Sequence, residues 1–177
     1  YILAEAKKRG IKTSGHVPFT LTMDDVSAAG LGSVEHMSYV LKAGSTRDKE
    51  ISEKVMAGKL AYRVALPMAL QSFDENTAMA VYRRMAQQGT AVVPTLSISQ
   101  STAFLDQDSH QNDAYLQYIG KGLKKTYEWR VTRAAQDSPD AIAERHEIYF
   151  KTTSLLSLLL KAGVTIIAGT DAGFLNS

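Results

Sequence analysis

Apolar residues recur along this chain in two alternating patterns, one typical of strands and one typical of helices. Apolar residues at intervals of three and four predict helices over residues 2–9, 23–29 and 74–89. Short apolar runs bounded by glycine or proline predict four strands, over residues 11–16, 33–37, 90–96 and 164–169. Strands that alternate with helices are typical of a parallel sheet, so we predict an α/β fold.

Local signals mark where several of these elements begin and end. Thr22 and Asp25 have the spacing of a capping box, which places a helix start at residue 23. Gly89 is a natural helix terminator after the periodic segment. Residues 46–57 predict an exposed helix, whereas residues 59–70 remain open between strand and helix because Pro67 disfavours both.

The longest connection lies between the third and fourth predicted strands. Residues 97–161 are far longer than an ordinary link, and they predict two helices, over 113–135 and 139–160. We therefore expect one domain over residues 1–177 that contains a helical insertion at 97–161. Its aromatic residues could line a pocket, although packing is the commoner role at helical spacing; they are Tyr115, Tyr118, Tyr127 and Trp129.

Composition narrows the class of protein. The 177 residues are 45% hydrophobic and 21% charged, which is typical of a soluble globular chain. The net charge of +2 gives no reason to expect a nucleic-acid or membrane partner. Cysteine is absent, so any metal would be held by nitrogen and oxygen ligands. The compartment cannot be read from these features, and the cytoplasm is only slightly favoured over an exported location.

Three residues that can bind metal follow predicted strands. His16 and His36 end the first and second strands, and Asp171 follows the fourth. Because the carboxyl ends of parallel strands meet at one face of a sheet, these side chains could converge there. Imidazole is the commonest neutral metal ligand, and a carboxylate can both bind metal and accept a proton.

Each candidate also has an ordinary structural interpretation. His16 could be a partly buried histidine bonded to a loop, and His36 could form a surface pair with Glu35. Asp171 could be a helix-capping or turn aspartate. His110 and His146 lie in polar or charged surroundings and are interpreted as structural or surface residues.

Four segments together resemble the amidohydrolase superfamily of metal-dependent hydrolases, in particular its imidazolonepropionase-like and prolidase-like branch. The resemblance implies a partial TIM (β/α)8 barrel, comprising barrel strands five to eight with helices outside. The matching segments are Ser14-Gly15-His16-Val17-Pro18, Ser33-Val34-Glu35-His36-Met37, Val92-Val93-Pro94-Thr95-Leu96 and Ala168-Gly169-Thr170-Asp171-Ala172-Gly173.

The resemblance also implies roles for the candidate residues. His16, His36 and Asp171 would bind a divalent metal, with zinc expected first and manganese or iron as alternatives. Asp171 would act as general base, and His36 is counted with it among the catalytic residues. The expected reaction is the attack of metal-activated water on a C–N bond in a small amide, cyclic amide or dipeptide.

The family pattern is incomplete in this chain. Members of the family carry a His-x-His pair on the first barrel strand, and no such pair occurs here. We therefore expect the chain alone to be inactive unless the missing N-terminal barrel half, or a second copy of the chain, completes the site. The alternative is a non-catalytic half-barrel that serves as an interaction or scaffold module.

Overall fold

The computed structural model describes residues 1–171 of the chain. These residues form two compact units. The first unit comprises Tyr1–Pro94 together with Lys151–Gly169, and the second comprises Thr95–Phe150 together with the segment that begins at Thr170.

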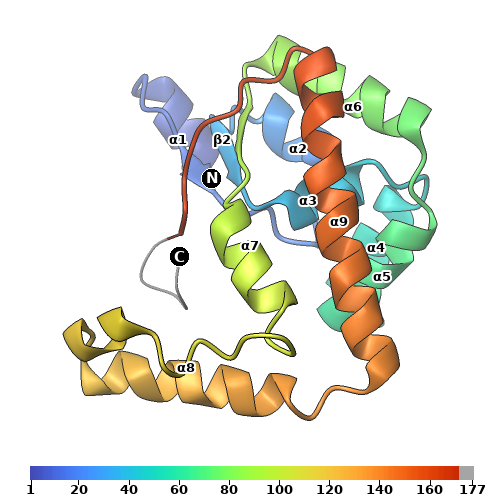
Figure 1. The fold of residues 1–177 in the computed structure, drawn as a ribbon. Coiled ribbons are helices and arrows are strands. Elements are labelled where there is room, and N and C mark those ends of the chain that lie inside the picture. The colour runs from blue at the N-terminus through green and yellow to red at the C-terminus, as the bar shows by residue number, and fades with distance from the viewer. Residues whose placement is uncertain (172–177) are drawn as a thin grey trace. The chain divides into compact units, whose positions relative to one another are not determined.

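The first unit contains a small parallel sheet (Figure 1). Its strands are β1 (Ser14–Gly15), β2 (Ser33–Glu35) and β3 (Ala91–Val93), in the order β1-β2-β3. Gly15 pairs with Val34, and Val34 pairs with Val92. Beyond β3, a single parallel bridge joins Val92 to Ile166, supported by a 2.9 Å hydrogen bond from the Ile167 amide to the Val92 carbonyl.

The predicted barrel half is wrong, although an α/β class is consistent with the structure. The described residues hold three strands of two or three residues in place of four longer ones, and most of the chain is helical. Pairing stops early at both ends of the predicted runs. Ile11 is 59% exposed and precedes β1 by three residues, and Pro94 has no N–H with which to extend β3.

Helices surround the sheet in the first unit, and those predicted near residues 2–9, 23–29, 46–57 and 74–89 are confirmed. Residues 59–70, which the sequence left undecided between strand and helix, mostly form a helix that contains Pro67. A helix that was not predicted follows β2. The helices are α1 (Ile2–Lys8), α2 (Met23–Ala28), α3 (Met37–Ala43), α4 (Asp48–Met56), α5 (Tyr62–Gln71) and α6 (Glu75–Gln88).

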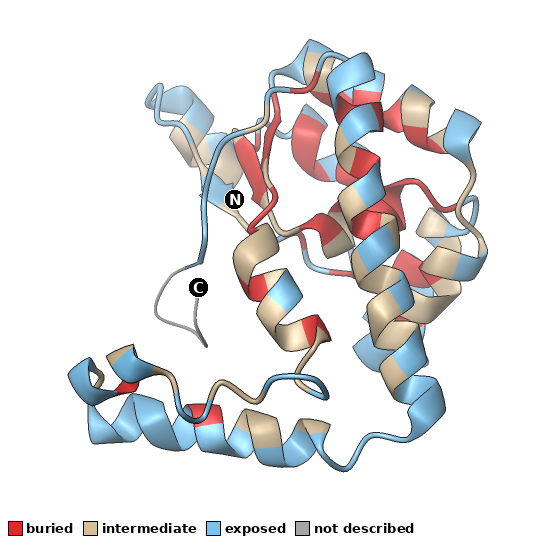
Figure 2. Cartoon of the chain, in the orientation of Figure 1, coloured by how far each residue is buried: buried red, intermediate tan, exposed pale blue. Residues whose placement is uncertain are grey.

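The core of this unit lies among β2, β3, α3 and α6. Val34, Val40, Tyr82 and Val92 are fully buried there (Figure 2). The Tyr82 hydroxyl donates a 2.9 Å hydrogen bond to the Val40 carbonyl, so α6 is tied to α3 by a polar contact as well as by packing. Burial raises the pKa of Tyr82, which keeps this donor protonated.

The second unit is helical. Its elements are α7 (Leu96–Ala103), the 3-10 helix η1 (Ala114–Tyr118), α8 (Lys121–Ala134) and the first part of α9 (Pro139–Lys161). The helix expected over 113–135 is therefore divided into η1 and α8, with Gly120 at the division. Ile98, Leu116 and Tyr127 form its core, against which Tyr115 packs. No described helix has the length and apolar character needed to cross a membrane.

Candidate functional site

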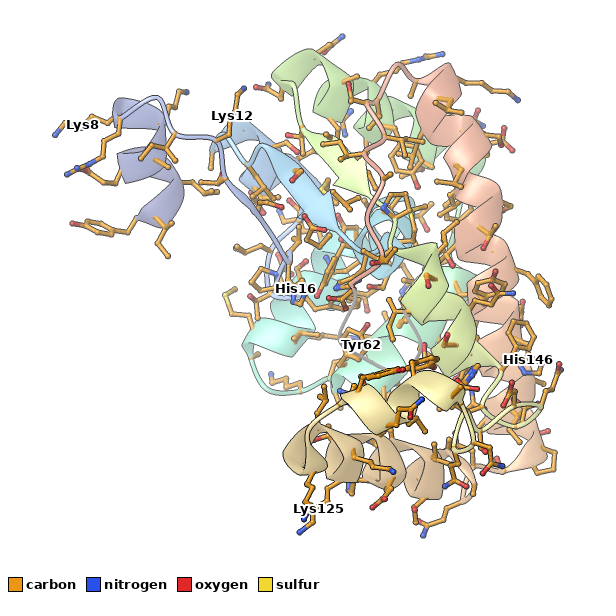
Figure 3. The ribbon with its side chains drawn as sticks, turned by 60° about the vertical axis from the view of Figure 1, so that its left-hand side comes forward. Lys8, Lys12, His16, Tyr62, Lys125 and His146 are labelled. Atoms are coloured by element: carbon orange, nitrogen blue, oxygen red, sulfur yellow. The ribbon has the colours of Figure 1, made fainter. Side chains whose placement is uncertain are left out.

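His16 and His36 lie side by side at the carboxyl ends of β1 and β2. His16 follows Gly15, and the pairing of Gly15 with Val34 brings it level with the end of β2. The two Nε2 atoms are 2.9 Å apart and form a hydrogen bond whose direction depends on the tautomers of the two rings, and the ring centroids are 4.7 Å apart. His16, labelled in Figure 3, is exposed, and His36 is half-buried.

The backbone of His36 holds an unusual conformation. Its φ angle is 69°, in the left-handed region that residues other than glycine seldom adopt. The His36 amide donates a 3.0 Å hydrogen bond to the Val93 carbonyl, which fixes the end of β2 against β3. Strain of this kind persists where the surrounding structure imposes it, and it is concentrated at functional sites.

A hydrogen-bond chain joins β1 and β2 beside the histidines. The Ser33 hydroxyl donates to the Ser14 hydroxyl over 2.7 Å, and the Ser14 hydroxyl donates to the Glu35 carboxylate. Ser33 and Glu35 are two residues apart in β2, so their side chains share one face of the sheet. These hydrogen bonds thus link the two strands whose ends carry the histidine pair.

Aromatic side chains stand next to the pair. The Tyr39 ring centroid lies 5.8 Å from that of His16 and 6.5 Å from that of His36. Phe19 contacts both Tyr39 and Tyr62, at 5.8 Å and 4.6 Å between centroids. Burial, with a smaller contribution from the neighbouring Tyr62, raises the pKa of Tyr39, so its phenol remains a hydrogen-bond donor. Tyr39 was not among the sequence candidates, although it lies one helical turn beyond His36.

The third candidate, Asp171, belongs to the second unit. It is exposed and has a φ angle of 60°. Among residues 1–171, no group of three or more His, Asp or Glu side chains could hold a metal ion. The structure therefore brings together two of the three predicted ligands, and the proposed contribution of Asp171 stays a prediction.

The spacing of the two imidazoles fits adjacent positions around a cation. Zinc–nitrogen bonds of about 2.1 Å separate two ligand nitrogens by about 3.0 Å at a right angle and by about 3.4 Å at the tetrahedral angle. The observed 2.9 Å between the Nε2 atoms is near the first value. A tetrahedral zinc would require the rings to move apart by about 0.5 Å, which exposed side chains can accommodate.

The other two histidines, His110 and His146, each form a hydrogen bond with a carboxylate of the second unit. His110 Nδ1 lies 3.0 Å from Asp113 Oδ2, and the His110 side chain is 16% exposed. His146 Nε2 lies 2.9 Å from Asp106 Oδ1. Both are partly buried and paired with a carboxylate, which agrees with their interpretation as structural or surface residues.

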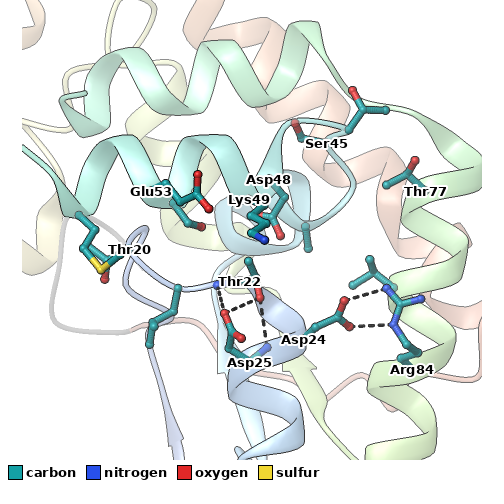
Figure 4. Close-up of a pocket in the computed structure, with 16 residues that line it drawn as sticks. Thr20, Thr22, Asp24, Asp25, Ser45, Asp48, Lys49, Glu53, Thr77 and Arg84 are labelled. Atoms are coloured by element: carbon teal, nitrogen blue, oxygen red, sulfur yellow. Dashed lines mark hydrogen bonds and ion pairs between the residues drawn. The ribbon is translucent and has the colours of Figure 1, made fainter. Parts of the chain in front are cut away.

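A separate hollow of about 860 Å³ lies among α2, α4 and α6 (Figure 4). Several of its charged groups are paired within the protein. Arg84 donates two hydrogen bonds, of 2.9 and 2.8 Å, to the Asp24 carboxylate. Asp25 accepts from the Thr22 amide and hydroxyl, at 3.0 and 2.6 Å. These contacts stabilise the helices that form the hollow.

Comparisons with known proteins give one informative similarity. No family model matches the chain, and no curated protein matches it. Among solved structures, bottromycin amidohydrolase is similar, with a TM-score of 0.60 and 17% sequence identity. The alignment covers 98% of this chain and 34% of that protein. At this identity the similarity concerns the fold alone, and the chain spans about a third of the length of that protein.

Proposed function

We propose that this chain is a hydrolase of the amidohydrolase type that uses a divalent metal to cleave a C–N bond. The observation that carries the proposal is the pair of imidazole nitrogens 2.9 Å apart at the ends of adjacent parallel strands. The fold similarity to bottromycin amidohydrolase and the strand-end segments of the sequence support the same class. The substrate would be a small amide, cyclic amide or dipeptide.

Each residue has a defined part in this proposal. His16 and His36 would bind the cation, zinc in the first instance and manganese or iron as alternatives, with Asp171 as a further ligand. A bound divalent cation polarises a carbonyl and lowers the pKa of water, which supplies the nucleophile near neutral pH. Asp171 would accept the proton from water and pass it to the leaving nitrogen.

A second candidate is a non-catalytic binding module. It is favoured by one observation, namely that no third His, Asp or Glu within residues 1–171 joins the histidine pair closely enough to form a metal cluster. In that case the histidine pair would contribute to recognition or structure, and the chain would hydrolyse none of the candidate substrates.

Hydrolysis assays distinguish these candidates. The protein, in the longest form that its gene encodes, is incubated with zinc or manganese and a panel of dipeptides and cyclic amides. We expect metal-dependent cleavage of at least one substrate, reduced more than a hundredfold by His16→Ala, His36→Ala or Asp171→Ala. His146→Ala, which removes a histidine bonded to Asp106, serves as the control and should retain activity. Failure to cleave any member of the panel would favour the binding module, and activity indifferent to His16 and His36 would contradict the roles assigned to the two histidines.

A further inference from the structure

Positive charge is concentrated on α8 far more than the composition suggests. The chain has 20 Lys and Arg against 18 Asp and Glu. Helix α8 contains five of these basic residues and one acidic residue, Glu128, within 14 positions. The rest of the chain therefore has 15 basic and 17 acidic residues, a net charge of −2. The overall value of +2 conceals a strongly basic helix.

The remainder of the second unit has the opposite charge. Outside α8, residues 95–150 contain a single cation among Lys and Arg, Arg145. The acidic residues of the same range are Asp106, Asp108, Asp113, Asp137, Asp140, Glu144 and Glu147. Because cations and anions are segregated in this way, a negatively charged surface would attract the unit by α8 and repel it elsewhere.

The solvent-facing side of α8 has a regular arrangement. Lys121, Lys125, Trp129 and Arg133 are spaced by four residues, so they form a stripe along one side of the helix. All four are exposed, and the indole of Trp129 is 57% exposed. The Arg133 guanidinium lies 5.6 Å from the Trp129 ring centroid. Figure 2 shows that α8 is largely exposed. Tyr127, its buried residue, is two positions from both Lys125 and Trp129, which places it on the other side of the helix.

We propose that α8 is a docking surface for an anionic phospholipid membrane, which it contacts through the stripe Lys121, Lys125, Trp129 and Arg133. Clusters of basic residues on a helix bind anionic lipid headgroups, and exposed Trp and Tyr rings partition into the headgroup region. Tyr118, which is 82% exposed, ends η1 three residues before α8 and adds a second such ring.

Bilayer binding suits this surface better than binding of a nucleic-acid strand. Strand-binding proteins enclose the backbone in a basic groove with several aromatic platforms. The stripe is on the convex side of one helix and forms no groove, and the surface has two aromatic rings, Trp129 and Tyr118. Such a side fits a flat, negatively charged interface, on which the helix would lie without crossing it. The inference is independent of the proposed hydrolase activity.

Trp129 is the single tryptophan in the sequence, so tryptophan fluorescence reports on the surroundings of α8 alone. Its fluorescence is recorded while the 177-residue chain is titrated with vesicles of phosphatidylcholine containing 30% phosphatidylserine, or with pure phosphatidylcholine. We expect a blue shift of the emission with the anionic vesicles alone, at low salt. Raising the salt to 0.5 M should abolish the shift, since counterions screen the attraction.

Matched charge reversals locate the contact. The variant Lys121→Glu/Lys125→Glu should raise the vesicle concentration for half-maximal binding at least tenfold. Lys8→Glu/Lys12→Glu changes the net charge equally at exposed residues of the first unit and should raise it less than threefold (Figure 3). Circular dichroism checks that each variant is folded.

Several outcomes would overturn the proposal. They are no spectral shift of the unmodified chain with anionic vesicles, an equal response to neutral vesicles, and equal weakening by the two double variants. Binding of a poly-dT oligonucleotide at lower concentration than the vesicles would assign the stripe to nucleic acid instead.

Discussion

At the residue scale, Lys42 shows how a single buried charge fixes local structure. Its side chain is only 4% exposed, and its ammonium donates to the Leu21 carbonyl at 3.0 Å and the Ser52 hydroxyl at 2.7 Å. It also forms an ion pair with Asp48. Burial raises the pKa of Asp48 and the Lys42 charge opposes that rise, so each partner compensates the desolvation of the other.

Removing Lys42 should therefore leave a buried carboxylate without its partner. We expect Lys42→Met to lower the free energy of unfolding by about 3 kcal/mol or more, as is typical when one member of a buried pair is lost. Lys49→Met on the exposed side of α4 is the matched control and should change stability by less than about 0.5 kcal/mol. Denaturant titration measures both, and equal effects would contradict the assigned role of Lys42.

The capping box of α2 makes a pH-dependent contribution. The Thr22 hydroxyl accepts from the Asp25 amide at 3.2 Å, and its hydrogen bond to the Asp25 carboxylate is the main reason that the pKa of Asp25 is lowered. A carboxyl with a lowered folded pKa stabilises the protein above its unfolded pKa of about 3.9, and the contribution is lost as the pH falls through the folded value.

Thr22→Ala should therefore cost about 1 kcal/mol of stability at pH 6, the usual cost of losing an N-cap side chain. The difference between the two proteins should shrink below pH 4, since Asp25 becomes protonated in the unmodified chain. Thermal unfolding followed by circular dichroism between pH 2.5 and 7 tests this. A difference that stays constant over that range would show that the carboxylate plays no part.

At the element scale, the position of the histidine pair depends on the close approach of β1 and β2. A Cβ atom on Gly32 would lie 2.7 Å from the Thr13 carbonyl oxygen, which accepts hydrogen bonds of 3.0 Å from the Gly32 and Ser33 amides. Only glycine fits here without moving the backbone. Gly15, in β1 itself, has no atom within 4 Å of such a Cβ.

This contrast provides a test of the strand pairing. We expect Gly32→Ala to reduce the unfolding free energy by about 1–3 kcal/mol, the usual range for a steric conflict in a packed region. Gly15→Ala should be neutral or slightly stabilising, because alanine loses less conformational entropy on folding. Guanidinium titrations of the two variants measure the difference, and a neutral Gly32→Ala would mean that the strands do not approach as described.

The elements also show which features the sequence can and cannot predict. The capping box identified α2, and periodicity together with Gly89 identified α6. In the structure the side chains of Thr22 and Asp74 accept hydrogen bonds at the N-termini of these two helices. The apolar runs suggested longer strands and a barrel half, and they missed α3. The buried residues Val40 and Leu41 show why: a short run buried on all sides has the same apolar pattern in a helix as in a strand.

The site was predictable to a similar extent. The βα alternation indicated that strand-end histidines would be neighbours, since adjacent parallel strands finish at the same edge. Tyr39 and the strained backbone of His36 were not predictable, because each depends on tertiary contacts, with Phe19 and with Val93 respectively. The concentration of charge on α8 was visible in the sequence but was obscured by the overall net charge.

At the scale of the whole molecule, the chain divides into two compact units, and α9 contributes residues to both. Its buried residues, Thr152, Leu155, Leu158 and Leu159, all follow the boundary at Lys151. Residues 139–150 contain no buried side chain. Buried packing therefore stabilises the part of α9 that follows Lys151 more than the part that precedes it.

Hydrogen exchange should reveal this difference. Backbone amides of residues 152–160 should exchange at least tenfold more slowly than those of residues 141–149, because buried packing suppresses local opening. Mass spectrometry or amide NMR of the unmodified chain provides the measurement. Uniform protection along α9 would contradict the division into two units.

The account as a whole depends on the binding of a divalent cation by His16 and His36. Calorimetric titration of the chain with zinc at pH 7.5 tests this most directly, alongside His16→Ala, His36→Ala and the control His146→Ala. We predict one saturable zinc site per chain in the unmodified protein and in the control, and at least a tenfold loss of affinity in each of the other two variants. Zinc binding that is absent from the unmodified chain, or that persists unchanged without either histidine, would contradict the central claim.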